Sequence, residues 1–154
     1  YDFSDPYAYN RMVVIVDGNR TDIDSMADLK GKSTANTISS TYAEEAEKHG
    51  AKVTGVDDLN QTFELLLSGR IDATLNSEVT FYDYLRAHPD ARIKIAAVSE
   101  NVTEVAIPLR KGEATASLRA VVNETIKEMR ESGELASLSK RFFGTDISTP
   151  AAKP

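Results

Sequence analysis

The chain has 154 residues, of which 41% are apolar and 27% charged, so it is too apolar for a disordered protein. Eighteen Lys and Arg stand against 24 Asp and Glu, and a formal charge of −6 without a basic stripe argues against nucleic-acid binding. The absence of Cys excludes a disulfide framework and a thiolate site, and two His disfavour a histidine-rich metal centre. No apolar run approaches the roughly 18 residues that span a bilayer.

The first two thirds of the chain alternate between strand-like and helix-like patterns. A β-branched run at 11–16 predicts a strand, and a short helical turn over 25–32 ends at Gly31. The periodicity then predicts strands at 33–37, 52–56 and 71–75, each followed by a helix, at 41–49, 59–68 and 78–87. Such alternation is typical of an α/β fold with a mainly parallel sheet flanked by helices.

The last third becomes helical. Strands are expected at 93–98 and 105–109, and apolar residues from Leu118 to Met129 follow the spacing of one long amphipathic helix. A second amphipathic helix is expected at 135–143, and residues 145–154 are expected to be a flexible tail. The apolar stripes of the two helices have no N-terminal sheet to cover in this sequence.

The segment from Thr37 to Tyr42 joins a predicted strand to a predicted helix. Ser39, Ser40, Thr41 and Tyr42 place hydroxyl groups beside the free N–H groups of a helix N-terminus, which is an arrangement suited to a carboxylate or phosphate. Ordinary N-capping by Ser40 explains the same residues equally well. Neither the phosphate-binding loop G-x-x-x-x-G-K-[ST] nor the dinucleotide-binding motif G-x-G-x-x-G is present.

A second candidate binding segment lies at the end of the strand predicted at 71–75. Asn76 and Ser77 lie at its carboxyl end, where ligand crevices open in parallel sheets. Helix capping is the more economical explanation for either residue taken alone. Asp72 within that strand is expected to be a structural hydrogen-bond acceptor rather than a base.

Catalytic signatures are weak. The sequence has no G-x-S-x-G motif, and neither His49 nor His88 stands in a motif with a nucleophile. No cofactor is expected. A carboxylate pair assembled in three dimensions remains compatible with the sequence.

Six segments in order resemble one family. Tyr1–Tyr7 (YDFSDPY), Asp28–Lys32 (DLKGK), Ser39–Tyr42 (SSTY), Gly69–Ala73 (GRIDA), Leu109–Gly112 (LRKG) and Arg141–Gly144 (RFFG) are similar to the polar amino-acid solute-binding proteins of bacterial ABC transporters, most closely the cystine type. The resemblance implies two α/β lobes that close on a ligand through a hinge.

The resemblance also implies how the chain is divided. Residues 1–10 end the first lobe and enter the crossover, 11–98 form the second α/β lobe, 99–112 return, 113–144 are C-terminal helices of the first lobe, and 145–154 are the tail. The first lobe's own sheet, with its aromatic wall and its carboxylate-binding arginine, would precede Tyr1. An export or lipoprotein signal is likewise expected outside these residues.

By resemblance, the corner at Ser39, Ser40 and Thr41 binds the α-carboxylate of an amino acid. Ser39 stands where the family often has Gly, and Ser77 where it commonly has an Asp that accepts from the α-ammonium. Either Asn76, Ser77 or Glu78 then takes over that acceptor role with weaker charge complementarity, or the ammonium group is bound elsewhere.

The expected function is capture of a polar amino acid such as cystine by the substrate-binding component of an importer. Its partners would be ABC permease subunits, which tie it peripherally to the membrane from the periplasm or extracellular surface. A cyclohexadienyl or arogenate dehydratase on the same fold is the alternative, and a ligand-sensing module a third. The uncovered apolar faces of the C-terminal helices are expected either to fold back on the second lobe or to be buried against another chain, and self-association is the favoured of the two.

Overall fold

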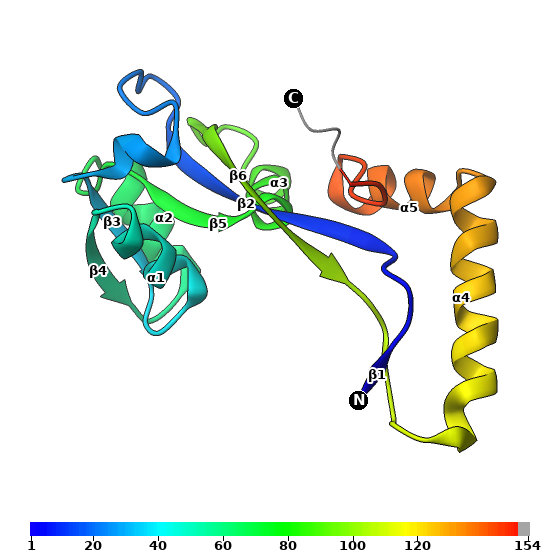
Figure 1. The fold of residues 1–154 in the computed structure, drawn as a ribbon. Coiled ribbons are helices and arrows are strands. Elements are labelled where there is room, and N and C mark those ends of the chain that lie inside the picture. The colour runs from blue at the N-terminus through cyan, green and yellow to red at the C-terminus, as the bar shows by residue number, and fades with distance from the viewer. Residues whose placement is uncertain (151–154) are drawn as a thin grey trace. The chain divides into compact units, whose positions relative to one another are not determined.

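The computed structural model describes residues 1–150 and divides into two compact units. Unit 1 consists of Tyr1–Asn10 and Val102–Pro154, and unit 2 of Arg11–Asn101. Strands β2 (Ala8–Asp17) and β6 (Ile93–Val105) carry the chain from one unit to the other (Figure 1). Unit 2 is therefore one continuous segment, whereas unit 1 is made of two segments that are separated in the sequence by the whole of unit 2.

Unit 2 holds a sheet whose strand order is β5-β2-β6, where β5 is Thr74–Ser77. β2 and β5 are antiparallel, with Met12 opposite Ser77 and Ile15 opposite Thr74. The strands β3 (Ser33–Thr37) and β4 (Lys52–Val56) form a parallel pair, and a parallel bridge from Thr34 to Ala73 links β3 to the start of β5. The sheet system is thus mixed.

The antiparallel pairing of β2 differs from the parallel arrangement that the alternation predicts for its neighbours. Alternation implies parallel strands only where a helix crosses over between them. The rule therefore applies to β3 and β4, which α1 connects, but not to β2, whose neighbours in the sheet are β5 and β6 and which is followed in the chain only by the short 3₁₀ helix η1 (Met26–Leu29) before β3.

Helices α1 (Thr41–Lys48), α2 (Leu59–Leu67) and α3 (Glu78–Ala87) complete unit 2. Because successive strand residues point to opposite faces, β2 contributes side chains to two hydrophobic cores. Val13 and Ile15 pack with Phe63 and Leu66 of α2 and Phe81 of α3. On the other face, the core contains Val14, Val16, Ile23, Leu29, Ala46, Ala73 and Leu75.

The strand expected at 71–75 is displaced to β5 at Thr74–Ser77. Ile71 and Asp72 form a bend instead, because Asp72 is tied to β3: its Oδ2 accepts from the backbone N–H and the hydroxyl of Ser33, at 2.7 and 2.8 Å. The expectation that Asp72 is a structural acceptor agrees with this geometry, while its place within a strand was wrong.

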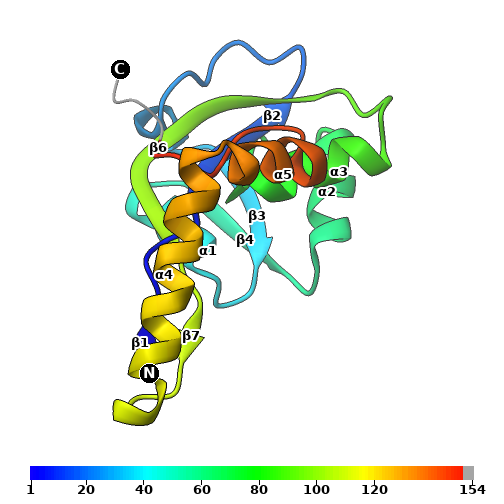
Figure 2. The ribbon, with the colours of Figure 1, turned by 90° about the vertical axis from the view of Figure 1, so that its right-hand side faces the viewer.

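Unit 1 combines a small antiparallel ribbon with two helices. β1 (Asp2–Phe3) pairs with β7 (Pro108–Leu109), and α4 (Ala116–Glu131) packs against α5 (Glu134–Phe143) after a 3₁₀ turn η2 (Glu113–Thr115) (Figure 2). The single strand expected at 105–109 is wrong: β6 continues to Val105, and β7 is separate. Pro108 cannot donate a ladder hydrogen bond and begins the shorter strand.

The flexible tail expected at 145–154 is corrected for its first residues. Ile147 and Ser148 are buried, and the N–H of Ile147 donates to Ser139 Oγ at 2.8 Å. Tyr9 N–H donates to the carbonyl of Ile147 at 2.7 Å, so this segment packs against the start of the chain. Residues 151–154 lie outside the described residues.

Candidate functional site

The candidate site lies where two parallel strands of unit 2 end. The parallel bridge from Thr34 to Ala73 sets the register of β3 against β5, which places Thr37 level with Asn76. Asn36 Nδ2 donates to the carbonyl of Leu75 at 2.7 Å, one residue before that level. Residues 39–42 therefore follow β3, and residues 76–77 are the last two of β5, at the same end of these two strands.

Each of these strands is followed directly by a helix whose N-cap is a serine. Ser40 Oγ accepts from Ala43 N–H at 3.2 Å and opens α1. Ser77 Oγ accepts from Thr80 N–H at 3.0 Å and opens α3. Two helix N-termini, each with partial positive charge, thus belong to one edge of the sheet and favour an anionic group there.

The turn before α1 has an unusual backbone. Ser39 has a φ of 58°, the only positive φ of a non-glycine residue among residues 1–150. Side chains other than glycine enter this left-handed region at a cost of about 1 kcal/mol or more. The turn thus keeps, with a serine, a conformation that favours glycine.

The hydroxyl of Thr41 and the N–H groups of Thr41 and Tyr42 lie in the first turn of α1. First-turn N–H groups have no carbonyl partner four residues earlier within the helix. Thr41 is exposed and Tyr42 partly exposed. This combination of donors suits a carboxylate.

Ser77 and Asn76 also form hydrogen bonds with neighbouring residues. Ser77 is buried and its Oγ lies 2.7 Å from Thr80 Oγ1, while Asn76 Oδ1 accepts from Ser77 N–H at 2.8 Å. The capping explanation for Ser77 therefore describes the structure. Asn76 is partly exposed, and within residues 1–150 its side-chain nitrogen makes no hydrogen bond.

Glu78 is not a free acceptor for an ammonium group, which corrects its expected role. Its two carboxylate oxygens accept from Nε and Nη2 of Arg11, both at 2.7 Å, and the residue is buried. This pairing with Glu78 raises the pKa of the Arg11 guanidinium further. The negative charge at the start of α3 is thus neutralised within unit 2.

Arg11 is the residue near this site that sequence reasoning missed. The antiparallel register of β2 on β5 brings it beside Glu78, which lies 67 residues away in the chain. A lone Arg before a β-branched run carries no local signal of that partner. Knowledge of the β2–β5 pairing is needed to find it.

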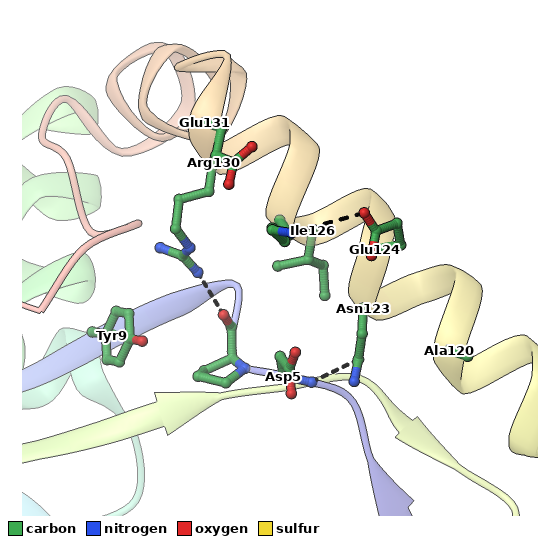
Figure 3. A pocket seen from close by; sticks show the side chains of 10 residues that line it. Asp5, Tyr9, Ala120, Asn123, Glu124, Ile126, Arg130 and Glu131 are labelled. Carbon is green, nitrogen blue, oxygen red and sulfur yellow. Dashed lines mark hydrogen bonds and ion pairs between the residues drawn. The ribbon is translucent and has the colours of Figure 1, made fainter.

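A hollow of about 350 Å³ lies within unit 1, between α4 and the first residues of the chain (Figure 3). Arg130 reaches in, donates to the carbonyl of Pro6 at 2.6 Å and to that of Ser148, and lies 5.9 Å from the Tyr9 ring centre. Asn123 Oδ1 accepts from Asp5 N–H at 2.8 Å. These contacts attach the N-terminal segment to α4. The side chains of Arg130 and Asn123 in the hollow therefore have a structural role.

Residues 1–150 meet the requirements of neither a metal site nor a membrane-spanning helix. Within residues 1–150, no three His, Asp or Glu side chains converge in a way that would hold a metal ion. Over the same range, no helix has the length and apolar character needed to traverse a bilayer.

A sequence model of the bacterial extracellular solute-binding proteins, family 3, matches residues 1–145. The chain belongs to this family. The match covers both units, so the mixed α/β architecture is that of a periplasmic-binding-protein-like fold.

Individual family members agree with this assignment. The chain is 37% identical over 148 residues to the L-cystine-binding protein TcyA of Bacillus subtilis, covering 96% of this chain and 54% of TcyA. It is 32% identical over 150 residues to the L-cystine-binding protein TcyJ of Escherichia coli K12, covering 96% of this chain and 55% of TcyJ. The chain thus spans about half the length of these solute-binding proteins.

A solved structure of the family shows the same fold. The L-cystine solute receptor of Neisseria gonorrhoeae, in its unliganded open conformation, superposes with a TM-score of 0.85 at 34% identity. The superposition covers 97% of this chain and 62% of the receptor. The fold class expected from the sequence is confirmed.

Proposed function

We propose that this solute-binding protein captures a polar amino acid, such as L-cystine, for an ABC importer. The observation that carries the proposal is the pair of serine-capped helix N-termini at one sheet edge in a chain of this family. The relatives TcyA and TcyJ and the gonococcal receptor are each named for L-cystine. These names favour binding over the dehydratase alternative.

In the proposed site, the α-carboxylate lies at the start of α1. The N–H groups of Thr41 and Tyr42 and the hydroxyls of Ser39, Ser40 and Thr41 are its donors. Asn76 and Ser77 contribute uncharged polar groups at the neighbouring strand end. Because Arg11 neutralises Glu78, this unit offers the ligand's ammonium group no free carboxylate at the start of α3.

The partners that follow from this function are the amino acid and ABC permease subunits, and the place of action is the periplasm or the extracellular surface. The family description, extracellular solute-binding proteins, supports that location. Hinge motion in such a receptor would take place in β2 and β6, the segments that join the units.

Calorimetric titration with a panel of L-amino acids tests the proposal. Saturable binding of a polar amino acid is expected, and Thr41→Val should weaken it by about tenfold through the loss of one hydrogen bond to a charged group. Thr21→Val is the matched control, because Thr21 is also exposed but lies in the loop after β2. Binding that Thr41→Val leaves unchanged would refute the assignment of the carboxylate site.

A further inference from the structure

Backbone pairing between β3 and β5 is limited to one place. Within residues 1–150, the only bridge between these strands joins Thr34 to Ala73, and the two strands belong to separate sheets. Toward their carboxyl ends, where the proposed site lies, side chains connect the strands instead. We call this connection, made by the side chains of Asn36 and Thr74, the β3–β5 seam.

Asn36 and Thr74 form a chain of hydrogen bonds across the β3–β5 seam. Asn36 Nδ2 donates to the carbonyl of Leu75 at 2.7 Å and to Thr74 Oγ1 at 3.3 Å. The Thr74 hydroxyl in turn donates to the carbonyl of Ala35 at 2.7 Å. Asn36 and Thr74 are exposed to only 2% and 0%, so bulk water does not compete for these bonds. Each strand thus holds the backbone of the other through a buried side chain.

The oxygen of the Asn36 amide has no comparable role. Asn36 Oδ1 is buried and has no hydrogen-bond partner among residues 1–150. Leaving a buried acceptor unpaired costs free energy, and an apolar side chain at this position of β3 would avoid that cost. The presence of an amide is therefore explained by the two bonds that its nitrogen makes across the β3–β5 seam.

The β3–β5 seam lies directly behind the two segments of the proposed site. Asn36 is three residues before Ser39, and Leu75 is the residue before Asn76. Among residues 1–150, the bridge between the strands is formed before this level. The side-chain bonds to the carbonyls of Ala35 and Leu75 therefore fix the separation of the two strand ends.

We propose that Asn36 and Thr74 are positioning residues of the amino-acid site, a role that rests on the proposed function. Both are too buried to touch a ligand. They act by holding the start of α1, after β3, at a fixed distance from the start of α3, after β5. A ligand that bonds to both strand ends needs its partners held to within about 0.5 Å. Loss of a bond in the β3–β5 seam should therefore weaken amino-acid binding.

Titration calorimetry with L-cystine on threonine variants tests this role. Thr74→Val keeps the shape of the side chain but removes the hydroxyl, and it should raise the Kd about tenfold. Thr74→Ser keeps the hydroxyl and should restore the Kd to within about twofold of the unsubstituted chain. Thr34→Val is the matched control, because Thr34 is buried in β3 and its hydroxyl has no hydrogen-bond partner among residues 1–150. It should leave the Kd unchanged.

Thr62→Val separates positioning from a general loss of stability. Thr62 is buried in α2 and its hydroxyl donates to the carbonyl of Asp58 at 3.3 Å, so this variant also loses a hydrogen bond from a buried threonine. Thr62→Val and Thr74→Val should both lower the melting temperature, but only Thr74→Val should raise the Kd. Equal changes of Kd in the two variants, or no change in Thr74→Val, would overturn the proposal.

A distance measurement needs no ligand, so it decides the positioning role even if L-cystine does not bind and the proposed function fails. The chain has no Cys, and nitroxides attached at Glu44→Cys in α1 and Asp83→Cys in α3 occupy exposed positions. Pulsed electron paramagnetic resonance should give the same narrow distance distribution with and without Thr34→Val, and a broadened or shifted one with Thr74→Val. Asn36→Leu breaks the β3–β5 seam from the other strand and should act alike, which covers the case that Thr74→Val does not fold. Distributions that neither substitution changes would refute the positioning role.

Discussion

At the scale of single residues, the pair of Arg11 and Glu78 is the strongest ionic contact near the site. Glu78 is buried and receives two charge-assisted hydrogen bonds of 2.7 Å, so its replacement leaves the Arg11 guanidinium without its acceptors. We expect Glu78→Gln to lower the free energy of unfolding by about 2–3 kcal/mol. Urea unfolding measures this change.

The control for that prediction is Asp83→Asn, which removes an exposed ion pair with Arg86 on the same helix. Pairs between exposed side chains typically contribute less than about 1 kcal/mol, so the free energy of unfolding should hardly change. Equal losses for Glu78→Gln and Asp83→Asn would show that burial gives the Arg11 pair no special weight.

Asp72 should make the stability of the chain depend on pH in the acid range. Burial alone would raise its pKa, but hydrogen bonds from the Ser33 N–H and hydroxyl and the pairing with Arg20 outweigh it and lower the pKa. The carboxylate therefore stabilises the folded state fully above its unfolded pKa of about 3.9, and this contribution is lost as pH falls through the lower folded pKa.

Asp72→Asn should thus destabilise the chain by about 1.5–3 kcal/mol at pH 7 and by much less at pH 2.5. Denaturant midpoints of both proteins between pH 7 and pH 2.5 measure the difference. A difference that stays constant over this range would contradict the assignment, because it would mean that the charge of Asp72 contributes nothing.

At the scale of elements, the first turn of α1 separates capping from binding. Ser40 Oγ caps the helix, so Ser40→Ala should lower the free energy of unfolding by about 1 kcal/mol. Thr41→Val removes an exposed hydroxyl without a cap contact and should leave the melting temperature of the unliganded protein nearly unchanged. Thermal unfolding monitored by circular dichroism distinguishes the two; a large drop for Thr41→Val would make Thr41 a structural residue.

The elements that local pattern controls were predictable, and those set by distant partners were not. Cap serines, glycine stops and 3.6-residue spacing predicted α1, α2 and α3 to within one or two residues. The displacement of β5 depends on the hydrogen bond between Asp72 and Ser33, 39 residues apart, and the antiparallel pairing of β2 with β5 joins two strands that are distant in the chain. Neither leaves a trace in local periodicity.

Some features of the candidate site were also predictable from local sequence, and others depend on distant partners. Ser40 and Ser77 were predictable as helix starts, and their common edge follows from the parallel order of β3 and β5. The neutralisation of Glu78 by Arg11 was not predictable, since it needs the register of β2 against β5. The charge of a site is thus harder to infer from sequence than its position.

At the scale of the whole molecule, an amino acid is expected to bind where β3 and β5 end. Nuclear magnetic resonance of the ¹⁵N-labelled chain, titrated with L-cystine, tests it most directly because it reports each amide separately and detects weak binding. Saturable shift changes are expected for the amides of Ser39–Tyr42 and Asn76–Ser77. Shift changes confined to the hollow beside Arg130, or none at any concentration, would contradict it.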